Sequence, residues 1–257
     1  MDSKDVEQKM ILDLDQFIPG HSVDCVIIGF ERQQLKILVL KLKFKDDLWV
    51  LPGGFIFDHE DIDKAAARVL KQRTGLELPY LEQFKTFGNA GRRDSKILTK
   101  HLASYGLKGK ITDWFSQRFI TTGYVSLVDI EKCNPKAYLY DEMIKWVAVE
   151  ELPHLIFDHN EIVNTAINFV KNQINYLPIG LTLLPKKFTM KQLQSLYEAI
   201  LGKKLDRGNF QRKMLKLGIF NRHEKQLEGG AHKAPYLYSF DQIKYKKLLE
   251  NGFGFNS

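Results

Sequence analysis

The sequence predicts an α+β fold in two parts: an α/β/α sandwich over residues 1–178 and a smaller helix-turn-helix domain with a strand hairpin over residues 179–257. Strand-like runs alternate with amphipathic helical patterns in the first part. Two closely spaced amphipathic patterns, joined by a Gly-containing turn, begin the second part. Two prolines and a glycine within residues 176–188 indicate the linker between them.

The strand order of the first part follows from short apolar runs. Residues 23–30 and 35–41 predict a hairpin, and further strands are expected at 81–88, 119–128 and 144–150. A helix is expected over residues 61–74, with Ile62, Ala65, Ala66 and Val69 on its buried face and Gly75 as its C-terminal cap. A second helix follows Asp158, which has the spacing of a capping box with Glu161.

A basic segment at residues 95–118 separates two of these strands. It contains a possible short helix and a Gly-rich turn, and it looks inserted into a hairpin. We expect it to be a surface excursion, and the sequence indicates no function for it.

The positive charge of the chain is concentrated at one end. Residues 181–257 contain 15 Lys and Arg against 6 Asp and Glu, a net charge of +9, whereas the remaining residues carry −2. Such an asymmetry indicates a polyanionic partner for the C-terminal third, with a merely solvated basic surface as the alternative.

Composition also limits the class of protein. The two cysteines, Cys25 and Cys133, have no spacing typical of a disulfide framework or a metal site. The longest apolar runs have the length of strands, and the N-terminal residues lack the apolar segment of a signal peptide. A cytoplasmic protein without a metal or other cofactor is therefore expected.

One motif in the first part is specific. Residues 54–76, GFIFDHEDIDKAAARVLKQRTGL, align without a gap to the pattern G-x5-E-x7-R-E-U-x-E-E-x-G-U, in which U is aliphatic. The frame positions that match are Gly54, Glu60, Arg68 and Gly75. The segment thus resembles the Nudix box, which implies that the sandwich has the Nudix fold.

The three remaining carboxylates of that pattern are missing. Val69, Gln72 and Arg73 stand where glutamates are expected. In the hydrolases that the segment resembles, those glutamates hold the divalent cations that act on a pyrophosphate. A guanidinium group repels a metal ion and cannot be deprotonated. The resemblance therefore implies a domain that binds a nucleotide or sugar derivative without cleaving it, and we expect no catalytic residues.

An alternative keeps the domain an enzyme. A metal-dependent pyrophosphohydrolase acting on ADP-ribose or nucleoside diphosphate derivatives could draw its metal ligands from the acidic residues Asp58, Glu60, Asp61 and Asp63. These carboxylates also complement the dipole of the helix that follows them. Gln72 and Arg73 weigh against the enzyme.

The C-terminal third has the pattern of a DNA-reading domain. Residues 188–201 predict an amphipathic helix with Thr189 as N-cap, and Asp206 caps a second helix whose inward residues are Phe210, Met214 and Leu217. In helix-turn-helix proteins the second helix enters the major groove. The candidate DNA-binding residues in the turn and on the outward face are Lys203, Lys204, Arg207, Asn209, Arg212, Lys213 and Lys216.

A strand hairpin with a Gly-Gly turn is expected after the second helix. Such a wing would place basic residues against phosphates beside the groove. The candidates are Arg222, His223, Lys225, His232 and Lys233.

The degenerate box and the segment LLPKKFTMKQLQSLYEAILGKKLDRGNFQRKM together make the chain similar to the Nudix-related transcriptional regulators, over almost its whole length. The resemblance implies a sensing domain, a winged helix-turn-helix domain, and a homodimer on palindromic double-stranded DNA. It also implies that ADP-ribose or a related phosphorylated sugar relieves DNA binding. The chain departs from the family in the insertion after Asp94 and in its GRRDS segment.

The effector site is expected beside residues 51–55, LPGGF. Gly53 and Gly54 allow a close approach of the backbone. Cationic side chains are candidates for contacts with anionic oxygens, because they bind phosphate without activating it for attack. These candidates are Arg68, Arg73, Arg92 and Arg93. For Arg68 the alternative is that it only braces the helix of the box, so Arg73 and Arg92 are the preferred candidates.

Overall fold

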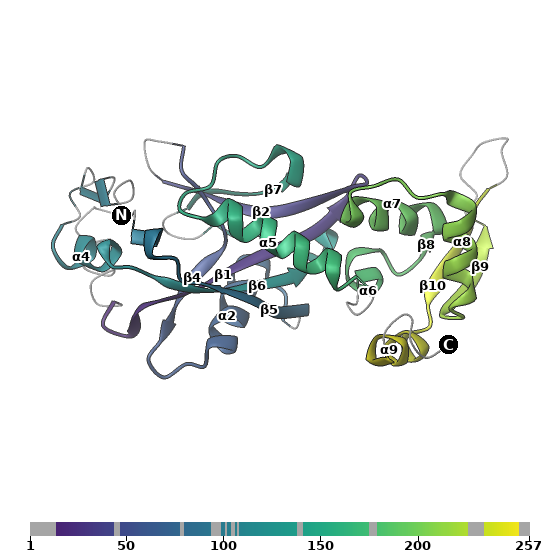
Figure 1. Ribbon diagram of the computed structural model, residues 1–257, viewed down its shortest axis with the longest axis horizontal. Coiled ribbons are helices and arrows are strands. Elements are labelled where there is room, and N and C mark those ends of the chain that lie inside the picture. The colour runs from purple at the N-terminus through teal and green to yellow at the C-terminus, as the bar shows by residue number, and fades with distance from the viewer. Residues whose placement is uncertain are drawn as a thin grey trace.

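The computed structural model describes residues 14–43, 47–77, 80–93, 99–100, 102–103, 106, 108–137, 141–174, 179–225 and 234–251. The molecule is elongated, with a large sheet toward one end and a small helical unit with its own sheet at the other (Figure 1). The boundary expected after residue 178 falls at the edge of residues 175–178, which lie outside the described part. Within the described part, no helix has the length and apolar character needed to cross a membrane.

A seven-stranded mixed sheet forms the frame of the large part. Its main path runs β3-β2-β1-β6-β5, β4 pairs with β1, and β7 pairs with β2. The strands are β1 (Phe17–Glu31), β2 (Gln34–Leu42), β3 (Trp49–Val50), β4 (Gly53–Phe57), β5 (Tyr80–Phe87), β6 (Ile120–Leu127) and β7 (Asp141–Ala148). The expected hairpin is confirmed as β1 and β2, and the other expected strands are confirmed as β5, β6 and β7.

Two helices cover opposite faces of this sheet, as a sandwich requires. Side chains alternate along a strand, so β1 serves both faces. Val23, Cys25 and Ile27 pack with the helix α2 (Ile62–Thr74), whereas Val26 and Ile28 belong to the core beneath α5 (His159–Asn172). The expected C-terminal cap of α2 is confirmed, because Gly75 has a φ of 75° in the left-handed region.

The expected capping box at the start of α5 is wrong. The side chain of Asp158 makes no capping hydrogen bond. Its carboxylate lies instead 2.6 Å from Nε of Arg92. An ion pair with a guanidinium outweighs a single bond to a backbone N–H, so the residue spacing alone was misleading.

The segment at residues 95–118 is confirmed as a connection between two antiparallel strands, β5 and β6, but it is not only a surface excursion. Its described residues include the helix α4 (Lys110–Ser116), whose Ile111 and Trp114 are buried. Trp114 packs edge-on against Phe55 of the box segment, with ring centroids 5.6 Å apart. The apolar residues of α4 thus bury part of the strand β4.

The C-terminal unit has the expected helix-turn-helix. Its elements are α6 (Ile179–Leu183), β8 (Phe188–Thr189), α7 (Met190–Leu201), α8 (Arg207–Lys216), β9 (Phe220–Lys225), β10 (Tyr236–Phe240) and α9 (Gln242–Asn251). Thr189 and Asp206 cap α7 and α8 as expected. The strands form a sheet in the order β8-β10-β9, and the sequence predicted neither β8 nor α9.

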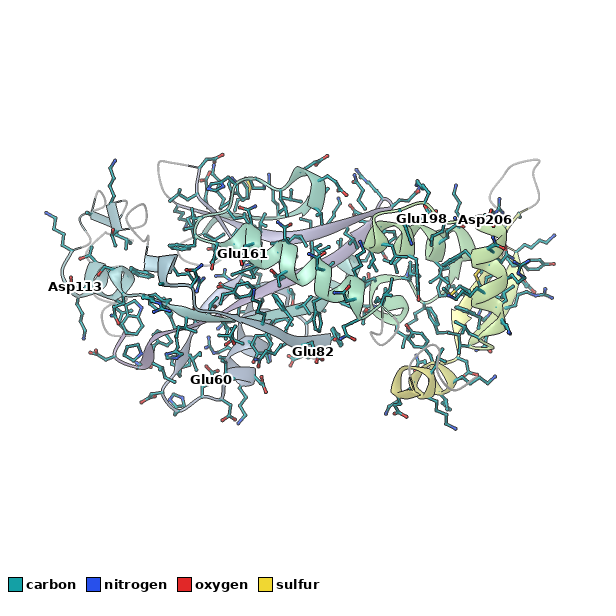
Figure 2. The ribbon with its side chains drawn as sticks, in the orientation of Figure 1. Glu60, Glu82, Asp113, Glu161, Glu198 and Asp206 are labelled. Carbon is teal, nitrogen blue, oxygen red and sulfur yellow. The ribbon has the colours of Figure 1, made fainter. Side chains whose placement is uncertain are left out.

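Glu198 holds the turn between α7 and α8. Its carboxylate accepts hydrogen bonds from the backbone N–H of Leu205 and from the amide of Gln194, both at 2.9 Å, and from Lys204 at 3.2 Å. These donors lower the pKa of Glu198 to about 2. Figure 2 places Glu198 and Asp206 close to this turn, far from Glu60 of the box.

One cluster of buried side chains joins the two parts. It contains Val26 and Ile37 of the large sheet, Ala166 of α5, and Leu193 and Phe210 of the helix-turn-helix. In addition, the hydroxyl of Ser195 on α7 lies 3.4 Å from the side-chain oxygen of Gln33, in the turn of the β1–β2 hairpin. The two parts therefore pack as neighbours with a shared apolar core.

We predict that Glu198→Gln weakens the acid sensitivity of the fold. The folded pKa of about 2 lies below the ordinary value of 4.5, so ionised Glu198 stabilises the protein above pH 4.5, and this contribution is lost as the pH falls toward 2. The variant should be less stable at pH 7 and should lose less stability than the wild type between those pH values. Denaturant titrations across this range measure both effects. The control is Glu161→Gln, because the side chain of Glu161 is 63% exposed. A pH profile of stability for Glu198→Gln that is identical to that of the wild type would contradict this role.

Candidate functional site

The two glycines of the box segment are required by packing. A Cβ atom on Gly53 would lie 2.5 Å from Oδ1 of Asp24, and one on Gly54 would lie 2.8 Å from Cγ2 of Val69. β4 therefore runs against β1 and α2 at a distance that only glycine permits. The groups that lie close to these glycines belong to the protein itself.

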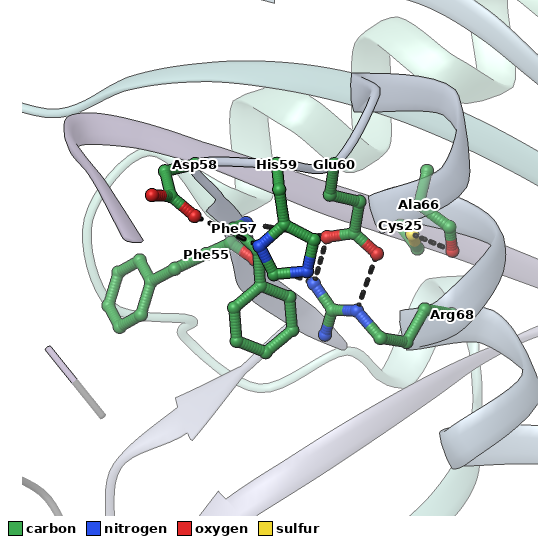
Figure 3. Close-up of polar contacts among 8 residues, drawn as sticks. All are labelled: Cys25, Phe55, Phe57, Asp58, His59, Glu60, Ala66 and Arg68. Carbon is green, nitrogen blue, oxygen red and sulfur yellow. Dashed lines mark hydrogen bonds and ion pairs between the residues drawn. The ribbon is translucent and has the colours of Figure 1, made fainter. Parts of the chain in front are cut away.

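Arg68 and Glu60 form a two-pronged ion pair across the box (Figure 3). Arg68 donates from Nε to Oε1 at 2.8 Å and from Nη2 to Oε2 at 2.7 Å, and Nη2 also donates to the carbonyl of Phe55. The guanidinium also stacks over the ring of Phe57, at 4.6 Å. The hydrogen bonds from Arg68 lower the pKa of Glu60. This pair braces the loop that precedes α2.

Arg73 points to the start of β7. Its guanidinium pairs with the carboxylate of Asp141, whose side chain is only 3% exposed. The pair links the last turn of α2 to the large sheet. The positive charge that replaces a glutamate of the box pattern is thus neutralised by a carboxylate of the chain itself.

Arg92 belongs to a third buried charge cluster. It lies 2.6 Å from Asp158 and 3.7 Å from Asp24, and its side chain is 8% exposed. His159 completes the cluster, because its Nδ1 accepts a hydrogen bond from the backbone N–H of Leu51 and its Nε2 faces Asp24 at 3.7 Å. Burial lowers the pKa of His159 and thus favours the neutral ring, and because Nδ1 accepts a hydrogen bond, the proton of a neutral ring lies on Nε2.

Three of the four candidate arginines have a carboxylate partner within the chain, and their contacts with a ligand stay a prediction. Arg68, Arg73 and Arg92 each form an ion pair with a carboxylate of the chain, and the need for a partner is greatest for Arg92, whose side chain is 8% exposed. The side chain of Arg93 lies outside the described residues.

Sequence reasoning missed Asp24 and Asp141, which face Arg92 and Arg73, and His159, which faces Asp24. Asp24 was the detectable signal, since a lone carboxylate interrupts the apolar strand of residues 23–30. Nothing in the spacing of Asp141 or His159 indicates their partners.

The box residues do not fit a divalent cation. Val69 is 2% exposed within an apolar cluster, Gln72 is exposed, and Arg73 is already paired. The four acids of the alternative site are also engaged separately: Asp58 with His59, Glu60 with Arg68, Asp61 with Lys64, and Asp63 with the hydroxyl of Tyr124. Within the described residues, no three His, Cys, Asp or Glu side chains are arranged to hold a metal.

A second candidate surface lies on α8. Its outward side chains are exposed, as are the two lysines of the preceding turn: Lys203, Lys204, Arg207, Asn209, Arg212, Lys213 and Lys216. The opposite face buries Phe210 and Met214 against α7. Arg212 donates a hydrogen bond to the side-chain oxygen of Asn209, so these two groups are held side by side. The arrangement gives a basic helix free to enter a groove.

The strand hairpin adds basic groups next to α8. Arg222 and Lys225 lie over the ring of Tyr236, at 4.6 Å and 5.3 Å from its centroid. These residues, with Lys187 before β8, line a concave surface that also includes His223. The tip of the hairpin, including His232 and Lys233, lies outside the described residues.

Comparisons with known proteins divide the chain in the same way. Residues 19–166 match the model of the NUDIX domain, and residues 180–240 match the NrtR DNA-binding winged helix domain. The ADPR responsive transcriptional repressor NtrR of Acinetobacter baylyi is 29% identical over 242 residues, which cover 90% of this chain and 88% of the relative. An RNA pyrophosphohydrolase of Bartonella clarridgeiae is 30% identical over 51% of this chain and 74% of its own length.

A solved structure resembles both parts together. The crystal structure of Shewanella oneidensis NrtR complexed with a 27mer DNA is 27% identical, covers 88% of this chain and 95% of its own, and superimposes with a TM-score of 0.65.

We predict that restoring a box carboxylate destabilises the fold at position 69 but hardly changes its stability at position 72. Val69→Glu buries a carboxylate in an apolar cluster and should cost about 3 kcal/mol or more of unfolding free energy. Gln72→Glu, on an exposed position of the same helix, should change stability by less than about 0.5 kcal/mol. Chemical denaturation measures both. Equal stabilities would show that Val69 is not packed as described.

Proposed function

This chain belongs to the family of Nudix-related transcriptional regulators, and we propose that it is a DNA-binding regulator whose Nudix domain senses a small phosphorylated metabolite. The observation that carries the proposal is the exposed basic face of α8, in a winged helix domain that packs directly on a Nudix domain. We place the boundary between the sensing and DNA-binding domains at residues 178 and 179.

ADP-ribose is the effector that we propose to test first. The Acinetobacter relative is described as ADPR responsive, and ADPR abbreviates ADP-ribose. We locate the effector site beside residues 51–55, where Gly53 contacts Asp24 and Asp24 faces Arg92. An anionic group of the ligand would compete with Asp158 for this guanidinium.

The link between the two sites runs through α5 in this proposal. Asp158 and His159 at its beginning join the cluster around Arg92, and Ala166 and Val170 further along it lie in the core shared with α7. A displacement at the start of α5 therefore acts on the surface that supports the helix-turn-helix. We further propose a homodimer on a palindromic operator, since one α8 reads only one half-site.

We propose that the Nudix domain does not hydrolyse its ligand. Support comes from buried Val69 and from the pairing of Arg73 with Asp141, which leave no place for the cations of a hydrolase. The pyrophosphohydrolase relative matches 51% of the chain, so this similarity supports a shared fold only.

The DNA-reading proposal is tested by truncating α8. Arg207→Ala and Asn209→Ala should each weaken binding to the specific operator by about 1 to 3 kcal/mol and change binding to random DNA little. Lys225→Ala should weaken binding to the operator and to random DNA about equally. It should also reduce the slope of log affinity against log salt concentration by about one unit. Mobility shifts at several salt concentrations separate these effects.

Lys64→Ala is the matched control, because Lys64 is an exposed cation on α2 of the Nudix domain. It should leave operator affinity unchanged. If Arg207, Asn209 and Arg212 all prove neutral on the operator, α8 is not the reading helix.

Hydrolysis is tested directly with the purified protein. ADP-ribose incubated with magnesium or manganese should remain intact, because the box lacks metal-binding carboxylates. Product formation is followed by chromatography. A metal-dependent turnover that Glu60→Gln abolishes would establish the hydrolase instead.

A further inference from the structure

Phe157 has an unusual backbone conformation. Among the described residues, three other than glycine have a positive φ: Arg32, Gln33 and Phe157. The first two form the tight turn between β1 and β2, where two left-handed residues are the favoured geometry. Phe157, at 58°, is the first central residue of a turn closed by a hydrogen bond of 3.4 Å from the N–H of His159 to the carbonyl of Ile156. Glycine dominates that position when φ is positive.

Burial of the ring does not account for this conformation. The side chain of Phe157 is 43% exposed, and its one described ring contact is with His159, at 5.6 Å between centroids. The backbone around it is fixed, because Ile156 donates to the carbonyl of Trp49 and Leu51 donates to His159. A bulky residue in a strained conformation, held by its surroundings, is typical of ligand clamps.

The groups next to Phe157 are polar and incompletely paired. Oδ1 of Asp158 is buried and has no hydrogen-bond donor within the described part of the chain, while Oδ2 faces Arg92. The residue that follows the exposed ring in the chain thus has one unpaired carboxylate oxygen, and its other oxygen pairs with a guanidinium. A nucleotide has the complementary groups: a planar base, hydroxyl or amino donors, and anionic oxygens.

We propose that Phe157 is the stacking platform for the base of a nucleotide effector, and that it distinguishes such ligands from sugar phosphates without a base. This assignment rests on the proposed function, because it names the ligand class of the same sensing site. Stacking of a base on an aromatic side chain strengthens binding by about tenfold to a hundredfold. That gain offsets the strain that the free protein carries at this position.

The experiment compares two ligands on the full chain by calorimetry. The wild type should bind ADP-ribose at least tenfold more tightly than ribose 5-phosphate. Phe157→Gly should weaken ADP-ribose binding by about tenfold to a hundredfold and leave ribose 5-phosphate unchanged, whereas Phe157→Trp should retain ADP-ribose affinity within about threefold. Met143→Ala, which removes an apolar side chain of similar exposure on β7, is the control that should change neither.

Thermal unfolding supplies a second readout. Glycine adopts a positive φ without strain, so the melting temperature of Phe157→Gly should not fall below that of the wild type. Loss of affinity without loss of stability indicates a ligand platform. A lowered melting temperature, or undiminished ADP-ribose binding by Phe157→Gly, would overturn the assignment and leave the sensor proposal standing. Failure of the wild type to bind either ligand would contradict the sensor proposal and the assignment with it.

Discussion

The shared apolar core between the large sheet and the helix-turn-helix is the interaction on which the rest of the structure depends. It runs from Val26 and Ile37 through Ala166 of α5 to Leu193 and Phe210. Core side chains pack at nearly crystalline density, so a shift of α5 cannot be absorbed within the Nudix domain alone. The two proposed functions therefore lie on either side of one packed unit, with the proposed sensing site at the beginning of α5 and the proposed DNA-reading helix α8 beyond its other end.

The charges of the Nudix box have been redistributed rather than removed. The frame pair of Glu60 and Arg68 is intact. Arg73 stands at a position where the family pattern has a glutamate, and it pairs with Asp141. The charge of Arg92 is balanced by Asp24 and Asp158, whose side chains are 9% and 18% exposed. The guanidinium groups of Arg73 and Arg92 are thus largely removed from water together with a carboxylate, and breaking either pair would leave an uncompensated buried charge.

Much of the fold could be predicted from the sequence, because periodicity and caps are local properties. The strands near β1, β2, β5, β6 and β7, the helices α2, α7 and α8, and the caps Gly75, Thr189 and Asp206 were all expected. The errors concern contacts between residues that are distant in the sequence. The side chain of Asp158 pairs with Arg92 instead of capping α5, and α4 packs on Phe55. The site followed the same rule. Its glycines and arginines were recognisable, but their partners Asp24, Asp141 and His159 come from other strands and helices. The left-handed backbone conformation of Phe157 could not be predicted from the sequence, because a bulky residue type rarely adopts a positive φ.

The central claim is that the Nudix domain binds its effector without a metal and that binding is coupled to DNA. Calorimetric titration of ADP-ribose in the presence of EDTA, with the free protein and with its operator complex, tests it most directly. The account predicts binding without metal and a different affinity in the two states. By linkage, a tenfold difference corresponds to about 1.4 kcal/mol of coupling and must equal the effect of ADP-ribose on operator affinity. Binding that requires magnesium, or equal affinity in both states, would contradict it.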